Sequence, residues 1–207
     1  MIFDTHIHTR DHSPDARVRA DVICRMAGDA GLDGIILTDH DYVWYPHEID
    51  MLRRETGNAL VILSGAEICF DAMHLVVFGC PPGPVPLFVQ PGDVIAWVRK
   101  HGGAVVVAHP FGPATVVDRD TIVALGADGV EAFNGRRKQM ERERIAWVES
   151  TGLAVIGATD FHGRGDDRIG RCGTEVPGGT ETMADVVRAI RERRTAAVVP
   201  GIGCYED

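Results

Sequence analysis

Short apolar runs alternate along the chain with longer segments in which apolar residues recur every three or four positions. The short runs are rich in β-branched residues, and they predict buried strands at residues 2–6, 34–38, 60–66, 75–78, 104–108, 129–133 and 153–158, with an eighth candidate at 196–199. The longer segments have the period of a helix and predict helices at residues 18–30, 47–55, 91–101, 119–125, 138–150 and 182–193.

This alternation of strand and helix predicts an α/β fold with a mostly parallel sheet covered by helices. Seven or eight such units fit a small barrel better than an open sheet. We expect a single domain over residues 1–207, because neither a linker nor an internal repeat interrupts the pattern. The proline-rich segment 81–86 cannot form a helix or a central strand, so we expect an extended loop there.

Composition adds limits on class and location. Hydrophobic residues make up 45% of the 207 residues and charged residues 25%, which is ordinary for a globular protein. No apolar run approaches the length of a membrane span, and the first residues lack the pattern of a secretory signal, so we expect a cytoplasmic protein without membrane contact. The five scattered cysteines lack a CxxC pair and are expected to be reduced thiols without a metal role.

The formal net charge of −9 argues against a general nucleic-acid-binding surface, which needs clustered Lys and Arg. It does not exclude an anionic substrate, because bound cations can reverse the sign of the local field.

Candidate chemistry gathers at the ends of the predicted strands. In parallel α/β folds the carboxyl ends of the strands carry the functional site. Six of the nine histidines lie at or beside such ends, so we expect them to be close in space: His6, His8, His40, His74, His109 and His162. Glu67 and Asp160 also follow predicted strands and bring carboxylates to the same place.

The spacing of these residues indicates metal binding. His6 and His8 are two positions apart, so in a strand they share one face and both can reach a single ion. Asp160 and His162 repeat this spacing. Buried imidazoles and carboxylates are costly unless they are paired or bind a metal, and so many at strand ends favour a metal centre.

Several segments together resemble the PHP (polymerase and histidinol phosphatase) superfamily. They occur in the family's order and cover most of the chain: DTHIHT at 4–9, SPD at 13–15, TDHD at 38–41, GAE at 65–67, HLVVFG at 74–79, AHP at 108–110, GVEAFNG at 129–135 and TDFHG at 159–163. The fold implied by this resemblance is a distorted (β/α)7 barrel with a metal site at the carboxyl ends of its strands.

The resemblance also implies three divalent ions, Mn, Fe or Zn, held by three groups of ligands. A first ion would be held by His6, His8, Glu67 and Asp160. Glu67 would bridge to a second ion that is also held by His74 and His109, and a third would be held by Asp15, His40 and His162. His12 lies on the same loop as Asp15 and is an alternative ligand for the third ion.

Such a centre favours phosphate chemistry. Three divalent ions, three ligating carboxylates and a bridging hydroxide leave a net charge of about +2, which attracts a phosphate ester more than a neutral amide. We therefore expect a hydrolase of phosphoric esters, most simply a phosphomonoesterase acting on a small phosphorylated metabolite or nucleotide. Its catalytic residues would be Glu67, His40 and Asp160, and His40, Asp39 or Asp41 could assist proton transfer to the leaving oxygen.

Residues that could contact the substrate follow two strands. Asn134, Arg136 and Arg137 come after the predicted strand at 129–133, and Arg164 and Arg171 come after the Asp160–His162 pair; both groups could hold phosphate.

Two other functions stay open. Tyr42, Trp44 and Tyr45 follow His40 and could stack bases, which would suit an exonuclease for short oligonucleotides. A non-catalytic metal-binding module is a further alternative, and a metal-dependent amidohydrolase is a weaker one. The oligomeric state is not predicted.

Overall fold

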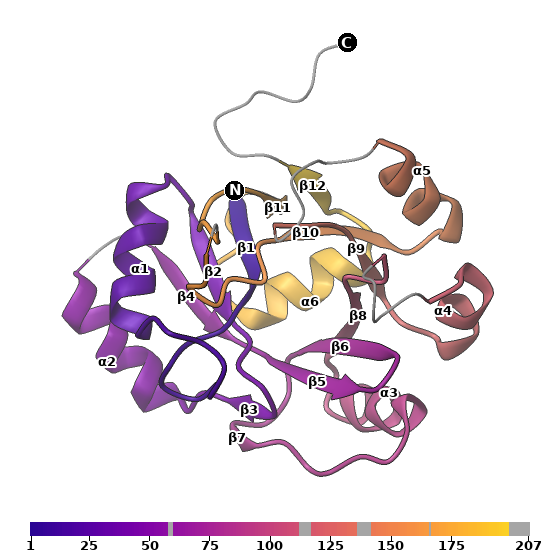
Figure 1. The fold of residues 1–207 in the computed structure, drawn as a ribbon, viewed down its shortest axis with the longest axis horizontal. Coiled ribbons are helices and arrows are strands. Elements are labelled where there is room, and N and C mark those ends of the chain that lie inside the picture. The colour runs from indigo at the N-terminus through magenta and orange to yellow at the C-terminus, as the bar shows by residue number, and fades with distance from the viewer. Residues whose placement is uncertain (58–59, 112–116, 136–141, 166, 199–207) are drawn as a thin grey trace.

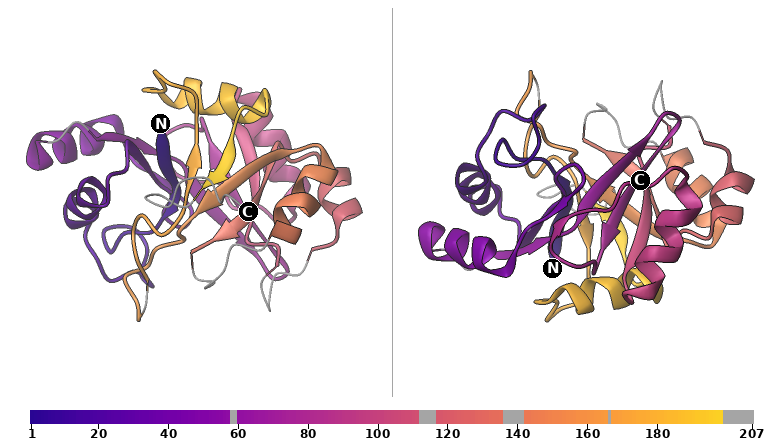
Figure 2. Two further views of the ribbon diagram at one scale, coloured as in Figure 1. Left: turned by 90° about the horizontal axis from the view of Figure 1, so that it is seen from above. Right: turned by 90° about the horizontal axis from the view of Figure 1, so that it is seen from below.

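Two five-stranded sheets form the centre of the molecule, and helices cover their outer faces (Figure 1). The computed structural model describes residues 1–57, 60–111, 117–135, 142–165 and 167–198. Within these residues a short two-stranded ribbon completes the strand pairing. Figure 2 shows α1 and α2 on one flank of the molecule, with α3, α4 and α5 on the opposite flank.

The first sheet has the order β12-β11-β1-β2-β4. Its strands are β1 (Ile2–Ile7), β2 (Gly34–Leu37), β4 (Val61–Ser64), β11 (Gly173–Glu175) and β12 (Ala196–Val198). The strands β1, β2 and β4 are parallel, whereas β11 is antiparallel to both β1 and β12. Two helices, α1 (Ala20–Asp29) and α2 (Pro46–Thr56), pack on this sheet through a cluster that includes Ile23, Ile35 and Leu52.

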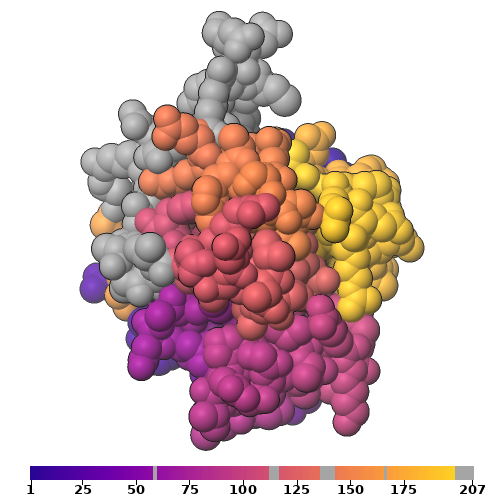
Figure 3. Space-filling view, turned by 90° about the vertical axis from the view of Figure 1, so that its right-hand side faces the viewer, coloured from indigo at the N-terminus to yellow at the C-terminus, as the bar shows by residue number. Residues whose placement is uncertain are grey.

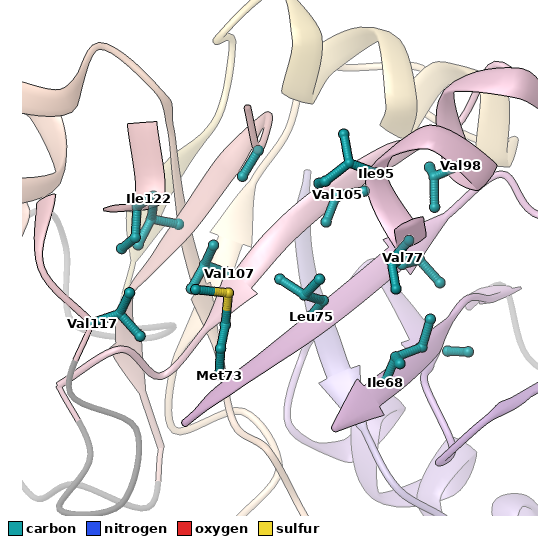
Figure 4. Packing of buried hydrophobic residues seen from close by; sticks show 14 of the residues in the cluster. Ile68, Met73, Leu75, Val77, Ile95, Val98, Val105, Val107, Val117 and Ile122 are labelled. Atoms are coloured by element: carbon teal, nitrogen blue, oxygen red, sulfur yellow. The ribbon is translucent and has the colours of Figure 1, made fainter. Parts of the chain in front are cut away.

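The second sheet has the order β10-β9-β8-β6-β5. Its strands are β5 (Ala66–Phe70), β6 (Met73–Phe78), β8 (Ala104–Ala108), β9 (Gly129–Asn134) and β10 (Ala154–Ala158). The strands β8, β9 and β10 are parallel, while β6 is antiparallel to both of its neighbours. Three helices, α3 (Pro91–Lys100), α4 (Arg119–Leu125) and α5 (Arg142–Thr151), belong to this half of the molecule. Figure 4 shows apolar residues of β5, β6 and β8 packed against α3 and α4.

A third apolar cluster lies between the two sheets. It combines Phe3 and Ile36 from the first sheet with Phe78 and Val106 from the second. Helix α6 (Met183–Arg191) completes this cluster with apolar residues that include Ile190. Figure 3 shows the outer face on which the segments containing α3, α4, α5 and α6 lie side by side. Among the described helices, none combines the length and the apolar character that a membrane crossing needs.

The sheets are joined by backbone hydrogen bonds near the ends that carry the histidines. On one side the amide of Gly65 donates to the carbonyl of Leu37 at 2.9 Å, where β4 runs into β5. On the other side the amide of His8 donates to the carbonyl of Phe161 at 2.9 Å, and the amide of Asp160 donates to the carbonyl of His6 at 2.9 Å. The strand ends are therefore fixed relative to each other by direct backbone contact.

The expected closed (β/α)7 barrel is not found among the described residues. At the amino end of β1, the strand β11 pairs with Ile2 and Phe3, and its Thr174 Oγ1 accepts a hydrogen bond from the Gly157 amide of β10 at 3.1 Å. At this end β11 therefore lies between β1 and β10, whereas at the carboxyl end Ile7 pairs with Phe161 of the segment after β10. The expectation of a mostly parallel sheet is also wrong for β5 and β6, because they form a hairpin.

The predicted elements follow the sequence pattern closely, with two exceptions, whereas β11 and the two-stranded ribbon were not predicted. The strand expected at 60–66 is split at Gly65 into β4 and β5, so Glu67 is the second residue of β5 and does not end a strand. The strand expected at 75–78 begins at Met73, so His74 lies inside β6. Part of the helix expected at 138–150 and the end of the strand expected at 196–199 lie outside the described residues.

The proline-rich segment is extended, as expected, and pairs with the loop that follows His40. Gly83 and Pro84 form β7 (Gly83–Pro84), which is antiparallel to β3 (Tyr42–Val43). The amide of Val85 donates to the carbonyl of Asp41 at 2.8 Å and extends this pairing toward the histidines.

Gly65 is required where the chain passes from one sheet to the other, because a Cβ atom there would collide with the carbonyl oxygen of Val77. We expect Gly65→Ala to lower the free energy of unfolding by roughly 1–3 kcal/mol or more, since a backbone atom cannot move aside as a side chain can. Urea denaturation measures this change. Gly92→Ala in α3 is the matched control: its Cβ would meet nothing within 4 Å, and an equal loss in both variants would contradict this account.

Candidate metal centre

Nine residues from several strands and from the loops that follow them form one cluster of imidazoles and carboxylates. Each is linked to another by a nitrogen-to-oxygen distance between 2.9 and 4.0 Å. These are the predicted ligands His6, His8, Asp15, His40, Glu67, His74, His109, Asp160 and His162. The structure thus brings together residues that lie as far apart in the sequence as β1 and the loop after β10.

The carboxylate of Glu67 is at the centre of this cluster and is 2% exposed. Its Oε1 atom lies 3.0 Å from His74 Nδ1, 3.2 Å from His109 Nε2 and 3.5 Å from His6 Nε2. Its Oε2 atom lies 3.2 Å from both His8 Nε2 and His40 Nδ1. One carboxylate therefore faces five imidazoles, three at Oε1 and two at Oε2.

Asp160 is a second buried carboxylate, and it contacts the same two histidines, His6 and His8. Its Oδ1 atom lies 3.6 Å from His6 Nε2 and 3.5 Å from His8 Nε2. Both Asp160 and His109 have left-handed backbone conformations, with φ of 52° and 31°. Residues other than glycine adopt such angles at a cost, and they are found where a site needs a particular side-chain direction.

The loop after β1 presents Asp15 to the cluster and turns His12 away from it. Asp15 Oδ2 lies 2.9 Å from His162 Nε2, and Asp15 Oδ1 lies 3.4 Å from His40 Nε2. The ring of His12 is 3.2 Å from a carboxylate oxygen of Glu48 and stacks on Tyr42 with 3.8 Å between ring centroids.

Glu131, within β9, contacts two of these histidines, His6 and His109. Its Oε1 atom is 2.7 Å from His6 Nδ1, and its Oε2 atom accepts hydrogen bonds from the His109 amide at 2.8 Å and from Asn134 Nδ2 at 3.1 Å. Such a contact fixes which nitrogen of His6 faces the cluster. We did not predict this residue, although a glutamate within a buried strand is a signal that it has a polar partner.

Asp39 and Asp4 orient backbone and hydroxyl groups, and they do not bind the imidazoles directly. Asp39 accepts hydrogen bonds from Ser13 Oγ at 2.6 Å and from Trp44 Nε1 at 2.7 Å. Its link to the cluster is indirect, because Ser13 Oγ in turn contacts His8. Asp4 accepts a hydrogen bond from the Thr159 amide at 3.0 Å. Burial raises the pKa of Asp4 to about 7 in spite of the hydrogen bonds from Thr159.

The charges of the cluster compensate one another. Burial alone would raise the pKa of Glu67, but the charge of His6 and the hydrogen bonds from His109 and His74 outweigh it and hold this pKa well below its ordinary range. Burial alone would lower the pKa of His6, but Glu131 and Glu67 outweigh it and raise this pKa well above its ordinary value. The carboxylates likewise raise the pKa values of His8 and His109 against the effect of burial.

Cys69 is a further member of the cluster, although we predicted no metal role for the cysteines. Its Sγ atom lies 3.5 Å from His40 Nδ1 and 3.5 Å from His74 Nδ1. Burial and the nearby carboxylates of Glu67 and Asp41 raise the pKa of this thiol. The signal that could have revealed it is the spacing of Glu67 and Cys69, which repeats that of His6 and His8.

The residues expected to contact substrate have different surroundings. Asn134 is buried and bonded to Glu131, as described above. Arg171 donates to the carbonyl of Gly135 at 3.1 Å and so joins the loops after β9 and β10. Arg164 is exposed and contacts Asp15. Arg136 and Arg137 lie outside the described residues.

The aromatic residues after His40 pack mainly against protein. Trp44 is buried and bonded to Asp39, and Tyr42 stacks on His12 and donates to Glu48 at 3.2 Å. Tyr45 is partly exposed at 38%.

The donors present fit divalent metal ions. The Nε2 atoms of His6 and His8 lie 3.0 Å apart and face the same space, together with Glu67. Asp15 Oδ1 is buried and accepts no hydrogen bond from the described residues. Groups of three donor atoms within 4.8 Å of one another are found among His8, His40 and His162, and again among Glu67, His74 and His109. Imidazole and carboxylate ligands together suit Mn, Fe and Zn.

The chain is similar in sequence to known proteins over parts of its length. Residues 142–195 match the PHP-associated family. An uncharacterized protein from Methanocaldococcus jannaschii is 28% identical over 143 residues, which are 65% of this chain and 82% of that protein.

Solved structures share the fold. A two-domain protein from Bacteroides vulgatus, which contains a predicted PHP-like metal-dependent phosphoesterase, is similar with a TM-score of 0.73 and 23% identity, over 97% of this chain and 65% of that one. An endonuclease Q, bound to duplex DNA with an abasic lesion at its active site, is similar with a TM-score of 0.64 and 16% identity, over 93% of this chain and 57% of that one.

The match of residues 142–195 to the PHP-associated family and the shared fold agree with the resemblance seen in the sequence motifs.

The pKa shifts predict how the metal-free protein responds to pH. The pKa values of His6, His8 and His109 are raised above 6.5, because hydrogen bonds and charges from Glu67 and neighbouring carboxylates outweigh burial. Their contribution to stability is therefore complete below the unfolded pKa and is lost as pH rises through the folded values. We expect the free energy of unfolding in chelator to fall as pH is raised from about 6 to about 9.

Urea denaturation in EDTA over this range measures the effect. Added divalent metal should oppose the fall, because metal binding needs neutral imidazoles and strengthens as pH rises. A metal-free stability that rises with pH would contradict the charge balance described here.

Proposed function

We propose that this protein is a metal-dependent hydrolase of phosphoric esters, most simply a phosphomonoesterase for a small phosphorylated metabolite or nucleotide. The observation that carries the proposal is the position of Glu67, whose two carboxylate oxygens each face imidazoles from different strands. A carboxylate in this position can bridge two ions, which is the arrangement that phosphate ester hydrolysis uses.

The distances support a division of the ligands into three groups. His6, His8 and Asp160 share one side of Glu67, while His74 and His109 share its Oε1 atom on another side. We propose that these groups hold two ions bridged by Glu67. A third ion would be held by Asp15, His40 and His162, because Asp15 lies between the other two rings.

Ions bound there would supply a nucleophilic hydroxide and offset the charge that develops on the phosphate oxygens. The residues of the chain orient this chemistry. Glu131 holds His6 so that Nε2 faces the other ligands, and the left-handed backbone at His109 and Asp160 aims both side chains inward. Arg164, exposed beside Asp15, is placed to contact an anionic substrate on the side of the third group.

The structure narrows the choice of proton donor to the leaving oxygen. Asp39 already accepts hydrogen bonds from Thr9, Ser13 and Trp44, so it is poorly placed to transfer a proton. His40 is partly exposed, and its neighbour Asp41 is exposed; desolvation of the Asp41 carboxyl raises its pKa against the opposing charge of His40. We therefore propose His40 or Asp41 for this step.

A nuclease is the second candidate, because the fold is shared with an endonuclease Q whose substrate is duplex DNA. The net charge of −9 and the packing of Tyr42 and Trp44 against protein count against a large nucleic-acid surface. Release of mononucleotides from the ends of short labelled oligonucleotides, with no release of phosphate from monoesters, would favour this candidate.

A non-catalytic metal-binding module is less well supported. Such a role does not need all nine donors to converge, yet they do so here.

Glu67→Gln tests the proposed activity. The substitution removes the charge that would bridge two ions, so we expect phosphate release from phosphorylated metabolites in the presence of Mn to fall by at least about a hundredfold. A colorimetric phosphate assay measures the rate, and circular dichroism checks the fold. Glu149→Gln, at an exposed position on α5, is the matched control and should keep full activity. Undiminished activity of Glu67→Gln would overturn the proposal.

Asp15→Asn and His12→Asn separate the two candidate ligands of the third group. Because Asp15 faces His40 and His162 whereas His12 is bonded to Glu48, we expect only Asp15→Asn to lower metal content by about one ion per chain. Elemental analysis after gel filtration measures the content. A loss in His12→Asn alone would assign the ligand to His12.

A further inference from the structure

Cys69 lies on the same face of β5 as Glu67. In that strand Ala66 and Ile68 are buried in the apolar cluster beneath the sheet, while the alternate positions Glu67 and Cys69 face the histidines. Cys69 is also directly opposite His74 in the antiparallel pairing of β5 with β6. The strand register therefore fixes the thiol at the edge of the cluster.

The surroundings of the sulfur are those of a ligand atom. Its Sγ lies 3.5 Å from a nitrogen of His40 and 3.5 Å from a nitrogen of His74. Donor atoms of His40, Glu67 and Cys69 all lie within 4.8 Å of one another, as close as those of the groups assigned above. A single S–H group can donate a hydrogen bond to only one of the two rings. The other ring therefore faces the lone pairs of the sulfur, which are the electrons that a metal ion would bind.

The side chain of Cys69 does not serve the core. It is exposed to solvent, whereas Cys24 and Cys172 are buried, and Cys80 packs against the apolar cluster of the second sheet. Burial of apolar surface therefore does not account for a cysteine at this position.

We propose that Cys69 is an additional, thiolate ligand of the metal centre, for the ion that Glu67 and His74 would also hold. The inference rests on the metal centre of the proposed function. On binding, the S–H bond is broken, a bond from sulfur to the ion forms, and the proton passes to solvent; no group is oxidised or reduced.

A sulfur donor changes which ion the site prefers. Thiolates favour Zn and Co over Mn and Mg, which prefer oxygen ligands. The ion bound by Cys69 would then be one that prefers sulfur, while the ion held by His6, His8 and Asp160 would have only nitrogen and oxygen donors. Substitution of Cys69 by Ser should thus reduce the preference of the protein for Zn over Mn.

Cobalt titration tests this assignment directly. Co(II) is added to the metal-free protein, and the near-ultraviolet spectrum is recorded for wild type, Cys69→Ser and the matched control Cys80→Ser. Wild type and Cys80→Ser should show a sulfur-to-cobalt charge-transfer band. Cys69→Ser should lack the band but keep visible absorption from cobalt bound to nitrogen and oxygen.

The outcomes separate this inference from the function on which it rests. Stoichiometric cobalt uptake without a charge-transfer band in wild type overturns the role of Cys69 and leaves the metal centre intact. A band that persists in Cys69→Ser also overturns it. Failure of wild type to bind cobalt, zinc or manganese overturns the metal centre itself.

Alkylation of wild type gives a second measurement that needs no variant. Iodoacetamide should modify the exposed Cys69 in the metal-free protein, and zinc should protect it, whereas labelling at Cys80 should not change. Equal labelling of Cys69 with and without bound zinc would contradict ligation.

Discussion

The structure depends on the balance of charge around one buried carboxylate. Glu67 is withdrawn from water and faces imidazoles from β1, β6 and the loops after β2 and β8. An unpaired carboxylate in such a place would be very costly, and an isolated imidazolium would be too. Each group is tolerable only because the others are present, so the strand ends must stay together for the cluster to exist.

The backbone meets this demand through direct hydrogen bonds between the two sheets. The pairs His8–Phe161 and His6–Asp160 tie β1 to the loop after β10, and Gly65 carries β4 into β5 beside Leu37. At the other end β11 lies between β1 and β10, and apolar residues of α6 fill the space between the sheets. The two ends thus have different tasks: one fixes the position of ligands, and the other supplies apolar burial.

Much of the fold and site could be predicted from the sequence, because alternation and spacing are local signals. The spacing of His6 and His8 predicts that both side chains lie on one face of a strand, and the helices follow the apolar periodicity of the sequence. The absence of a closed barrel could not be predicted, because the insertion of β11 depends on a long-range pairing between Thr174 and Phe3 that no local pattern encodes. Glu131 and Cys69 were missed for a related reason: each lies within a largely apolar strand, and its role depends on partners from other parts of the chain.

The pairing of β3 with β7 has a consequence for the backbone beside His40. Asp41, which directly follows His40, is held by the hydrogen bond from Val85 and by the neighbouring proline-rich strand. Prolines restrict the unfolded chain, so the entropy that this segment loses on folding is reduced. One of the proposed ligands is therefore attached to a backbone that is ordered before any ion binds, and metal binding there need not include the cost of ordering that segment.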